Sequence, residues 1–190
     1  MPQCHFEDGK ILEVVEELRL LGVLVRSDLS WSSQCDYMCK RGFSRLWMLR
    51  RLKPLGASIQ ELMEVYQTQI RCLMEFAVAA WNAGLTRKQV GQLERVQKCA
   101  FAIILGNDYV SYENALKVLN MKSLSERRKD LCIAFAIKSK KNEKYSTWFC
   151  DNVNTLNTRS SKPNLKPVQT RLRRFEKTPL PYLTKLLNDN

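Results

Sequence analysis

Three helix-start signals, each followed by apolar residues at helical spacing, constrain the fold of this chain more than any other feature. Each signal is a Ser or Thr followed three residues later by Glu or Gln. In this capping-box pattern the two side chains satisfy backbone amides of the first helical turn. The pairs are Ser58 with Glu61, Thr86 with Gln89, and Ser123 with Glu126. The sequence therefore predicts a mainly α-helical protein.

Apolar residues recur on one stripe in each of these three segments, and we expect the stripes to face a common core. The first segment should end near Gly84 and the second near Gly106, and residues 112–119 suit a further short helix. The stripe residues are Ile59, Leu62, Tyr66, Ile70, Leu73, Ala77 and Trp81 in the first segment, Val90, Leu93, Val96, Gln97, Ala100 and Ile104 in the second, and Leu131, Ala134, Phe135 and Ala136 in the third.

An earlier long helix is predicted between a cap at Asp28 or Ser30 and a stop at Pro54 and Gly56. Its apolar residues are Tyr37, Met38, Phe43, Leu46, Trp47, Leu49 and Leu52. Because Phe43 and Trp47 fall on the same stripe as the leucines, we expect both rings mainly in the core.

The two ends of the chain differ from this helical middle. Residues 11–26 mix β-branched and apolar residues around the polar step Glu16-Glu17, which suits a tight β-hairpin, although a helix also fits the pattern. Residues 151–190 contain eight Lys or Arg against three Asp or Glu, and apolar residues become rare. We therefore predict an N-terminal hairpin segment (1–28), a helical bundle (29–150) and an extended, largely irregular basic tail (151–190). The sequence PLPYLTKLLN at its end could add a short docking turn or helix.

The charge balance points to a polyanionic partner. The 190 residues include 31 Lys or Arg and 19 Asp or Glu, a formal net charge of +12. Such a surplus attracts nucleic acid or an anionic membrane surface, although it could also serve only to keep a helical domain soluble. No apolar run reaches the roughly 20 residues that a membrane-spanning helix needs. We expect a soluble protein that binds nucleic acid rather than a membrane.

The segment RGFSRLWMLRRLK is the best single candidate for nucleic-acid binding. Basic side chains can contact phosphates, while an aromatic face can stack on a base. The predicted binding residues are Lys40, Arg41, Arg45, Arg50, Arg51 and Lys53 in the first helix, with Arg171, Arg173 and Arg174 in the tail.

Catalytic and metal sites are not predicted. A polymerase needs carboxylates that converge on two metal ions, and the chain has no Asp-Asp pair and no glycine-rich phosphate loop. The single histidine, His5, stands in a polar N-terminal stretch, where we expect an incidental surface residue. Cys35 and Cys39 could share a helix face, but two thiols do not make a zinc site. The seven scattered cysteines suggest reduced thiols of an intracellular protein. We expect this protein in the nucleus or the cytoplasm, and we expect it to bind no cofactor.

Several blocks of the chain resemble the reverse transcriptases of LINE-type (non-LTR) retrotransposons. In order, they are LLGVLVRSDLSW, RLWMLRRLKPLG, ELMEVYQTQIRCLMEFAVAAWNAGLT, LERVQKCAFAIILG, ERRKDLCIAFA and the terminal PLPYLTKLLN. The resemblance runs from about residue 10 to the C-terminus. A Cys/His zinc knuckle, which some C-terminal regions of the family carry, is missing.

The resemblance implies that the LLGV strand is the last element of the palm and that the helices from Ser30 onward form the thumb and the segment behind it. It also implies that the fingers, the catalytic palm and an endonuclease would precede this region. We therefore expect a non-catalytic reverse-transcriptase fragment that binds RNA, DNA or their hybrid through the backbone. The alternatives are a helical module that packs on a protein partner, such as a reverse-transcriptase palm, and an unselected retroelement relic.

Overall fold

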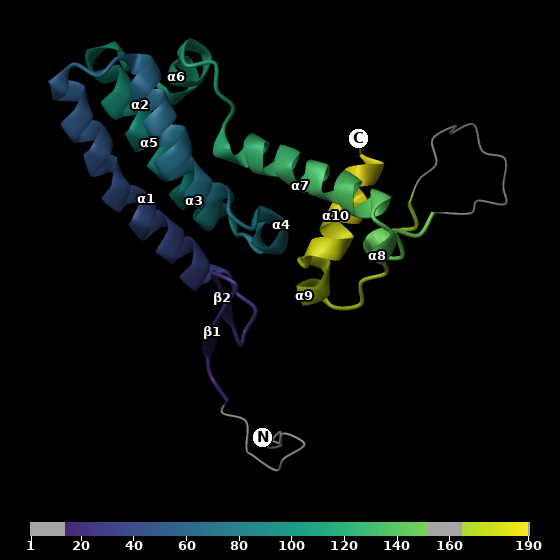
Figure 1. Cartoon of the computed structure of the whole chain (residues 1–190). Helices are drawn as coiled ribbons and strands as arrows, with labels where there is room; N and C mark the ends of the chain where they lie inside the picture. Colours follow the sequence, from purple (N-terminus) through teal and green to yellow (C-terminus); the bar gives the residue numbers. More distant parts are fainter. Residues whose placement is uncertain (1–13, 152–164, 190) are drawn as a thin grey trace, which may run out of the picture.

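The computed structural model describes residues 14–151 and 165–189 of the chain. Figure 1 shows a helical bundle with a small hairpin at one end and a second group of helices to its side. The elements are β1 (Glu17–Leu20), β2 (Val23–Arg26), α1 (Ser32–Leu52), η1 (Lys53–Leu55), α2 (Ile59–Val65), η2 (Tyr66–Arg71), α3 (Cys72–Glu75), α4 (Val78–Trp81), η3 (Asn82–Gly84), α5 (Arg87–Leu105), η4 (Gly106–Asp108), α6 (Tyr112–Val118), α7 (Leu124–Lys141), α8 (Glu143–Ser146), α9 (Arg173–Glu176) and α10 (Pro179–Asn188). The mainly helical fold with an N-terminal hairpin is confirmed.

The hairpin turns at Leu21 and Gly22, not at the Glu16-Glu17 step where we expected it. Strands β1 and β2 pair antiparallel, and Leu20 lies opposite Val23. Both turn residues have a positive φ, 47° at Leu21 and 88° at Gly22. Turns with two positive φ angles match the right-handed twist of paired strands, and glycine adopts this conformation without strain. The sequence LLGV therefore forms the turn itself.

The hairpin is attached to the N-terminal half of α1. The backbone amide of Leu24 donates to Oε1 of the buried Gln34 at 2.9 Å. On the other strand, Arg19 donates to the hydroxyl of Tyr37 at 3.0 Å. A two-stranded hairpin is marginal in water by itself, so these contacts with α1 hold it in place.

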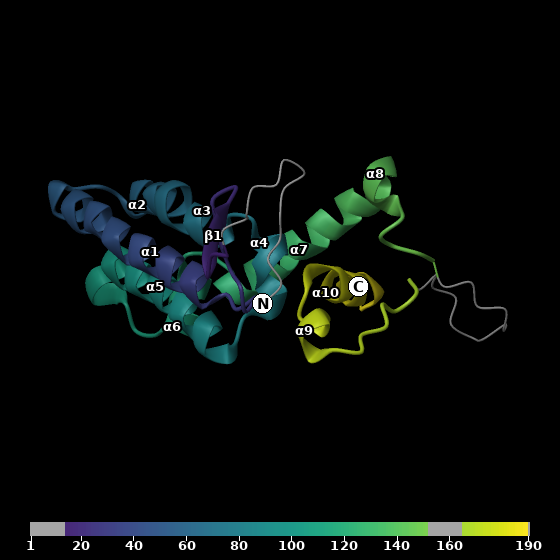
Figure 2. The same cartoon turned by 90° about the horizontal axis from the view of Figure 1, so that it is seen from below.

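Three helical rods form the main bundle: α1, α5, and the continuous rod α2–η2–α3. Figures 1 and 2 show them side by side, with α6 at one end of α5. Apolar side chains from all three rods form one continuous core. Its largest fully buried members include Leu46, Leu49, Leu62, Tyr66, Ile70, Met74, Leu93, Phe101 and Ile104. The stripe of α5 is buried as expected from Leu93 to Ile104, whereas Val90 at its start is only half-buried.

Gly42 lets the rods approach closely in the middle of α1. A Cβ at this position would lie 2.9 Å from Cγ1 of Val96 on α5 and 3.0 Å from Cε of Met74 on α3. Glycine inside a helix costs about 0.5–1 kcal/mol relative to alanine, so the benefit of Gly42 lies in this close contact between helices.

The helix expected from Ser58 to Gly84 is interrupted twice. It passes through the π-helical turn η2, and it breaks at Phe76 and Ala77, where Ala77 has φ 51°. The indole Nε1 of the buried Trp81 donates to the Phe76 carbonyl at 2.8 Å, which satisfies a backbone group at the break. Because of this break, Ala77 is exposed. Ile59, at the start of the predicted stripe, is also exposed.

All three predicted capping boxes form, with both reciprocal hydrogen bonds present in each. The first helix differs, because α1 begins after Trp31, which makes no capping hydrogen bond through its side chain. Asp28 instead accepts a hydrogen bond from the backbone amide of Ser30 at 2.9 Å. The predicted cap residues of this helix thus organise the turn that precedes it.

Helix α7 extends away from the bundle, and α10 packs against it (Figure 1). The terminal sequence PLPYLTKLLN is the helix α10, in which Leu183 and Leu186 are buried. Burial on α7 differs from expectation: Ala136 is buried, but Ala134 and Phe135 are exposed. The expected irregular tail therefore contains the helices α9 and α10, and residues 152–164 lie outside the described part of the chain.

Arg128 on α7 is a fully buried basic residue. Its Nε donates to Oδ1 of Asn82 at 3.2 Å, while its Nη1 has no hydrogen-bond partner among the described residues. Burial lowers the pKa of Arg128, because a charged guanidinium is poorly solvated in the core. This side chain cannot contact an external ligand.

Candidate functional site

The outer face of α1 exposes two aromatic rings between basic side chains. Lys40, Phe43 and Trp47 follow one another at three- and four-residue spacing, Arg50 and Arg51 come three and four residues after Trp47, and all five are exposed. The exposed fractions are 36% for Phe43 and 55% for Trp47. Residues at this spacing lie above one another on one helix face. We call these five residues the α1 stripe.

The expectation that Phe43 and Trp47 lie in the core was wrong. The buried face of α1 contains Cys35, Met38, Cys39, Gly42, Leu46 and Leu49. At 100° per residue, the two rings point about a quarter of a turn or more away from the centre of that face. The sequence did not distinguish the buried face from the exposed face. The apolar residues at 43, 46, 47 and 49 occupy a wider arc of α1 than the arc that the neighbouring helices cover.

Arg41 and Arg45 project from a different side of α1. Arg41 donates to the hydroxyl of Tyr37 at 2.6 Å, and Arg45 donates to the backbone carbonyl of Gln69 in η2. The hydrogen bond from Arg41, together with the nearby charge of Arg19, lowers the pKa of Tyr37. These two predicted binding residues therefore have protein partners and do not belong to the α1 stripe.

Lys53 turns inward to the C-terminal end of α5. Its Nζ donates to the carbonyl of Ile103 at 2.7 Å and to that of Ile104 at 2.9 Å. The last carbonyls of a helix have no intrahelical donor, and a cation there also meets the negative end of the helix dipole. Lys53 thus stabilises the junction of η1 and α5, although the sequence marked it as a binding residue.

The tail bases are separate from the α1 stripe. Arg171 is exposed just before α9. Arg173 and Arg174 begin α9, but their side chains lie outside the described part of the structure. Figures 1 and 2 both place α9 away from the length of α1. The predicted binding residues do not form one continuous surface, and only Lys40, Arg50 and Arg51 lie beside the exposed rings.

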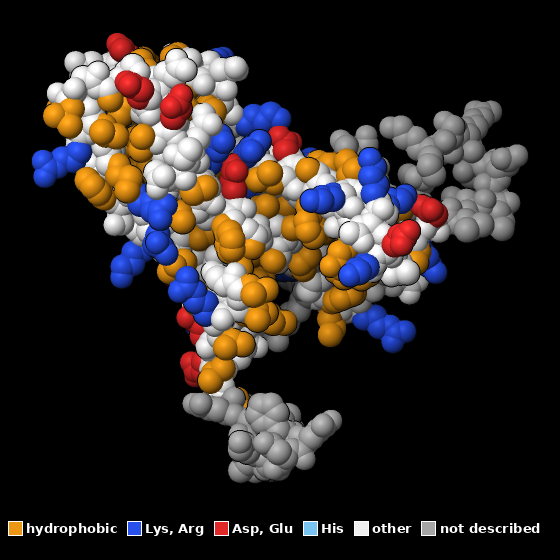
Figure 3. Space-filling view, viewed as in Figure 1, with side chains coloured by type: hydrophobic (Ala, Val, Ile, Leu, Met, Phe, Trp, Pro, Cys, Tyr) orange, Lys and Arg blue, Asp and Glu red, His pale blue; other side chains and the backbone are white. Residues whose placement is uncertain are grey.

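Figure 3 shows basic side chains along the edge of the molecule that α1 forms, with hydrophobic side chains between them. Lysine and arginine contact phosphates without regard to base identity, and an exposed indole offers a flat face for stacking. An interface of this kind suits a flexible strand whose bases can reach the rings.

A second exposed surface is apolar. Val14, Val15, Leu18, Leu20 and Leu21 on and beside the hairpin have exposed fractions between 45% and 90%. We call these residues the hairpin patch. Apolar residues that gather at an exposed edge mark contact sites for other proteins more often than single exposed leucines do.

Sequence reasoning missed a half-buried ionic cluster around Glu75. Arg71, four residues earlier, and Arg127 at the start of α7 both lie against this carboxylate. Only the spacing of Arg71 and Glu75 was visible in the sequence, as an ordinary helical pair. Nothing in the sequence signals that Arg127 joins them across 52 residues.

Within 14–151 and 165–189, no group of three or more His, Cys, Asp or Glu side chains could hold a metal ion. In the same ranges, no helix is long and apolar enough to cross a membrane. His5 lies outside the described residues. Comparisons with family models, curated proteins and solved structures found no match to this chain.

Proposed function

We propose that this chain is a non-catalytic nucleic-acid-binding region that holds RNA, DNA or their hybrid by the backbone, with little sequence preference. The α1 stripe carries the proposal: Phe43 and Trp47 are exposed on the same helix face as Lys40, Arg50 and Arg51. An exposed ring costs hydrophobic stability, and base stacking gives it a use.

The resemblance to LINE-type reverse transcriptases supports the same proposal. A thumb-like bundle that contacts a nucleic acid needs a basic face, and the α1 stripe supplies one. We place such a protein inside the cell, in the nucleus or the cytoplasm. Because the chain lacks the carboxylate pair of a polymerase, we expect no primer extension by the chain alone with magnesium, primer-template and deoxynucleotides.

The test compares three variants of the full chain by fluorescence anisotropy with a labelled single-stranded oligonucleotide. Replacing Lys40, Arg50 and Arg51 by Gln should weaken binding to many sequences alike. It should also reduce the slope of log K against log salt by about 0.7 for each phosphate that the protein no longer neutralises. As a matched control, three exposed lysines of α7 are replaced by Gln, namely Lys129, Lys138 and Lys141.

Trp47→Ala is the third variant, and it separates binding from folding. Base stacking contributes about 1–3 kcal/mol per base, so affinity should fall at least about fivefold. Because the ring is 55% exposed, the free energy of unfolding should change by less than about 1 kcal/mol, well below the loss of a buried tryptophan. Unchanged affinity in both α1 variants, or an equal loss in the α7 control, would contradict the proposal.

The hairpin patch supports a second candidate function, a contact with a protein partner. Its apolar side chains would bury against an apolar surface, and such binding responds little to salt. Replacing Leu18 and Leu20 by Ser should then abolish partner binding and leave nucleic-acid binding intact. If the α1 variants retain oligonucleotide binding while the hairpin variant no longer binds a protein, the second function replaces the first.

A further inference from the structure

We propose that the cavity between η2 and the start of α7 binds a phosphoryl group. The cavity has a volume of about 250 Å³, and three basic side chains line it: Arg71, Lys122 and Arg127. They come from three segments, the end of η2, the loop before α7 and the first turns of α7. Figure 1 shows α7 on the side of the bundle away from α1, so this site is distinct from the α1 stripe.

Arg71 has donor capacity that the protein does not use. Its Nε is buried and lies 3.3 Å from Oε1 of Glu75, but it makes no hydrogen bond among the described residues. Its Nη1 lies 4.0 Å from Sδ of Met121, and a thioether is a weak acceptor. Nη2 donates to Oε1 of Gln67 at 3.3 Å. The Arg71 side chain is 18% exposed, and the hydrogens on its Nη atoms, which have weak or long contacts, are free to meet an anion that accepts two of them.

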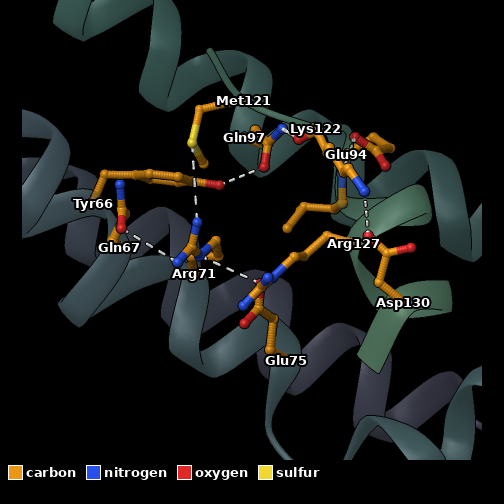
Figure 4. Close-up of polar contacts among 11 residues, drawn as sticks. Tyr66, Gln67, Arg71, Glu75, Glu94, Gln97, Met121, Lys122, Arg127 and Asp130 are labelled. Atoms are coloured by element: carbon orange, nitrogen blue, oxygen red, sulfur yellow. Dashed lines mark hydrogen bonds and ion pairs between the residues drawn. The ribbon is translucent and has the colours of Figure 1, made fainter. Parts of the chain in front are cut away.

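Glu75 positions Arg71 and Arg127 beside each other. Its Oε1 lies 3.3 Å from Nε of Arg71 and 3.1 Å from Nε of Arg127. Figure 4 shows the two guanidinium groups meeting at this carboxylate. The Glu75 side chain is only 15% exposed. One carboxylate cannot neutralise two cations, so a positive charge remains next to the cavity.

Lys122 completes the basic lining and can move. Its Nζ lies 2.6 Å from Oδ2 of Asp130, but the two side chains are 64% and 45% exposed. A solvent-exposed pair of this kind contributes little to stability, so Lys122 can turn to an anion at low cost. Its backbone is held in place, because the Lys122 carbonyl accepts a hydrogen bond from Nε2 of the buried Gln97 at 3.0 Å.

The arrangement fits a phosphoryl group better than a carboxylate. A carboxylate presents two oxygens in one plane, while a phosphoryl group presents three around a tetrahedron. Three donors that converge from separate segments can each meet one phosphoryl oxygen. Counting Glu75 and Asp130 against the three bases leaves a net charge of +1, so an anion is favoured over a cation. The π-helical turn that ends at Arg71 supports this view, since such turns recur at functional sites.

The experiment titrates the full chain with inorganic phosphate, with chloride at equal ionic strength and acetate as reference anions. We expect heat of binding for phosphate alone in isothermal titration calorimetry. Arg127→Gln and Lys122→Gln should each weaken phosphate binding about tenfold, because each removes one charge-assisted hydrogen bond. Lys129→Gln is the control, since Lys129 is an exposed base of the same helix that does not line the cavity.

Thermal unfolding of the Lys122→Gln and Arg127→Gln variants separates a loss of phosphate binding from a loss of folding. Lys122 is exposed, so Lys122→Gln should leave thermal unfolding unchanged even if Arg127→Gln lowers it. Phosphate binding that does not exceed chloride or acetate binding would overturn the proposal. An equal loss in the Lys129→Gln control, or full affinity in Lys122→Gln and Arg127→Gln, would overturn it as well.

A second arm identifies the source of the phosphoryl group. Two oligonucleotides that differ only in a 5′-phosphate are compared with the parent chain and with Arg127→Gln. Tighter binding of the phosphorylated strand, lost in Arg127→Gln, assigns the site to a nucleic-acid end. Equal binding of both strands, with inorganic phosphate still bound, assigns it to a small phosphate ester. Loss of oligonucleotide binding in the α1 variants affects neither result.

Discussion

Replacing Gln97 with methionine removes the centre of a buried hydrogen-bond network, and we expect the free energy of unfolding to fall by about 2 kcal/mol. Gln97 accepts a hydrogen bond from the hydroxyl of Tyr66 and donates to that of Tyr112 at 2.9 Å. It also donates to the Lys122 carbonyl at 3.0 Å. These bonds join η2, α5, α6 and the loop before α7.

The magnitude follows from what each partner loses. Tyr66 and Gln97 are each 1% exposed, so the Tyr66 hydroxyl would lose its acceptor in a place that water does not reach. A buried polar group left without a partner costs about 1–3 kcal/mol. Tyr112 still donates to Glu94, and water can reach the exposed Lys122. Methionine fills a similar volume, so the orphaned hydroxyl should dominate the loss.

Urea unfolding and thermal unfolding of three variants measure the effect. For a chain of this size, a loss of 2 kcal/mol lowers Tm by about 4–8 °C. Tyr66→Phe removes the hydroxyl itself, so adding it to Gln97→Met should restore part of the stability that Gln97→Met loses. The reasoning fails if Gln97→Met costs less than about 0.5 kcal/mol, or if the double variant loses the sum of the single losses.

Three further results are expected from the fold. Gly42→Ala should lower the free energy of unfolding by about 1 kcal/mol, because crowding between α1, α3 and α5 outweighs the gain in helix propensity. Gly91→Ala should raise the free energy of unfolding slightly, because a Cβ there would have nothing within 4 Å, and opposite signs for the two variants would contradict this packing. Burial raises the pKa of Tyr66 and of Tyr112, so the contribution of these two tyrosines to stability should be constant below about pH 9. Stability should fall as the pH rises through 10, where unfolded tyrosine ionises, and a circular-dichroism titration that shows no alkaline loss would refute the assignment. Arg128→Met should leave the free energy of unfolding unchanged or raise it by about 1 kcal/mol, because it removes a buried charge that has no carboxylate partner among the described residues. A fall of more than about 2 kcal/mol in urea unfolding would show that the guanidinium is stabilising.

The basic side chains of the protein fall into separate groups, two of which belong to the proposed sites on α1 and at the cavity. Arg50 and Arg51 are exposed and have no described ion-pair partner, whereas Arg71 and Arg127 are held by Glu75 and line the cavity. Other bases, among them Arg45 and Lys53, stabilise the fold by donating to backbone carbonyls. The net charge of +12 therefore overstates the charge that a ligand meets.

The sequence by itself determined the features that depend on residues close together along the chain. The capping boxes at Ser58, Thr86 and Ser123 start helices where expected, because each box is closed by a residue only three positions away. The hairpin and the terminal helix α10 were visible for the same reason. The position of the hairpin turn was nevertheless predicted wrongly, because we did not infer from the sequence LLGV that Leu21 and Gly22 adopt positive φ angles.

Only the tertiary structure decided which side of each helix is covered. Helical periodicity allowed Trp47 on the buried side of α1, but α5 and α3 cover the adjacent face and leave the ring in solvent. The break at Ala77 depends on packing around Trp81, and the meeting of Arg71 with Arg127 depends on where α7 joins the bundle. Local patterns specify dihedral angles and caps, whereas exposure and long-range ion pairs depend on the relative placement of whole helices, which no short segment encodes.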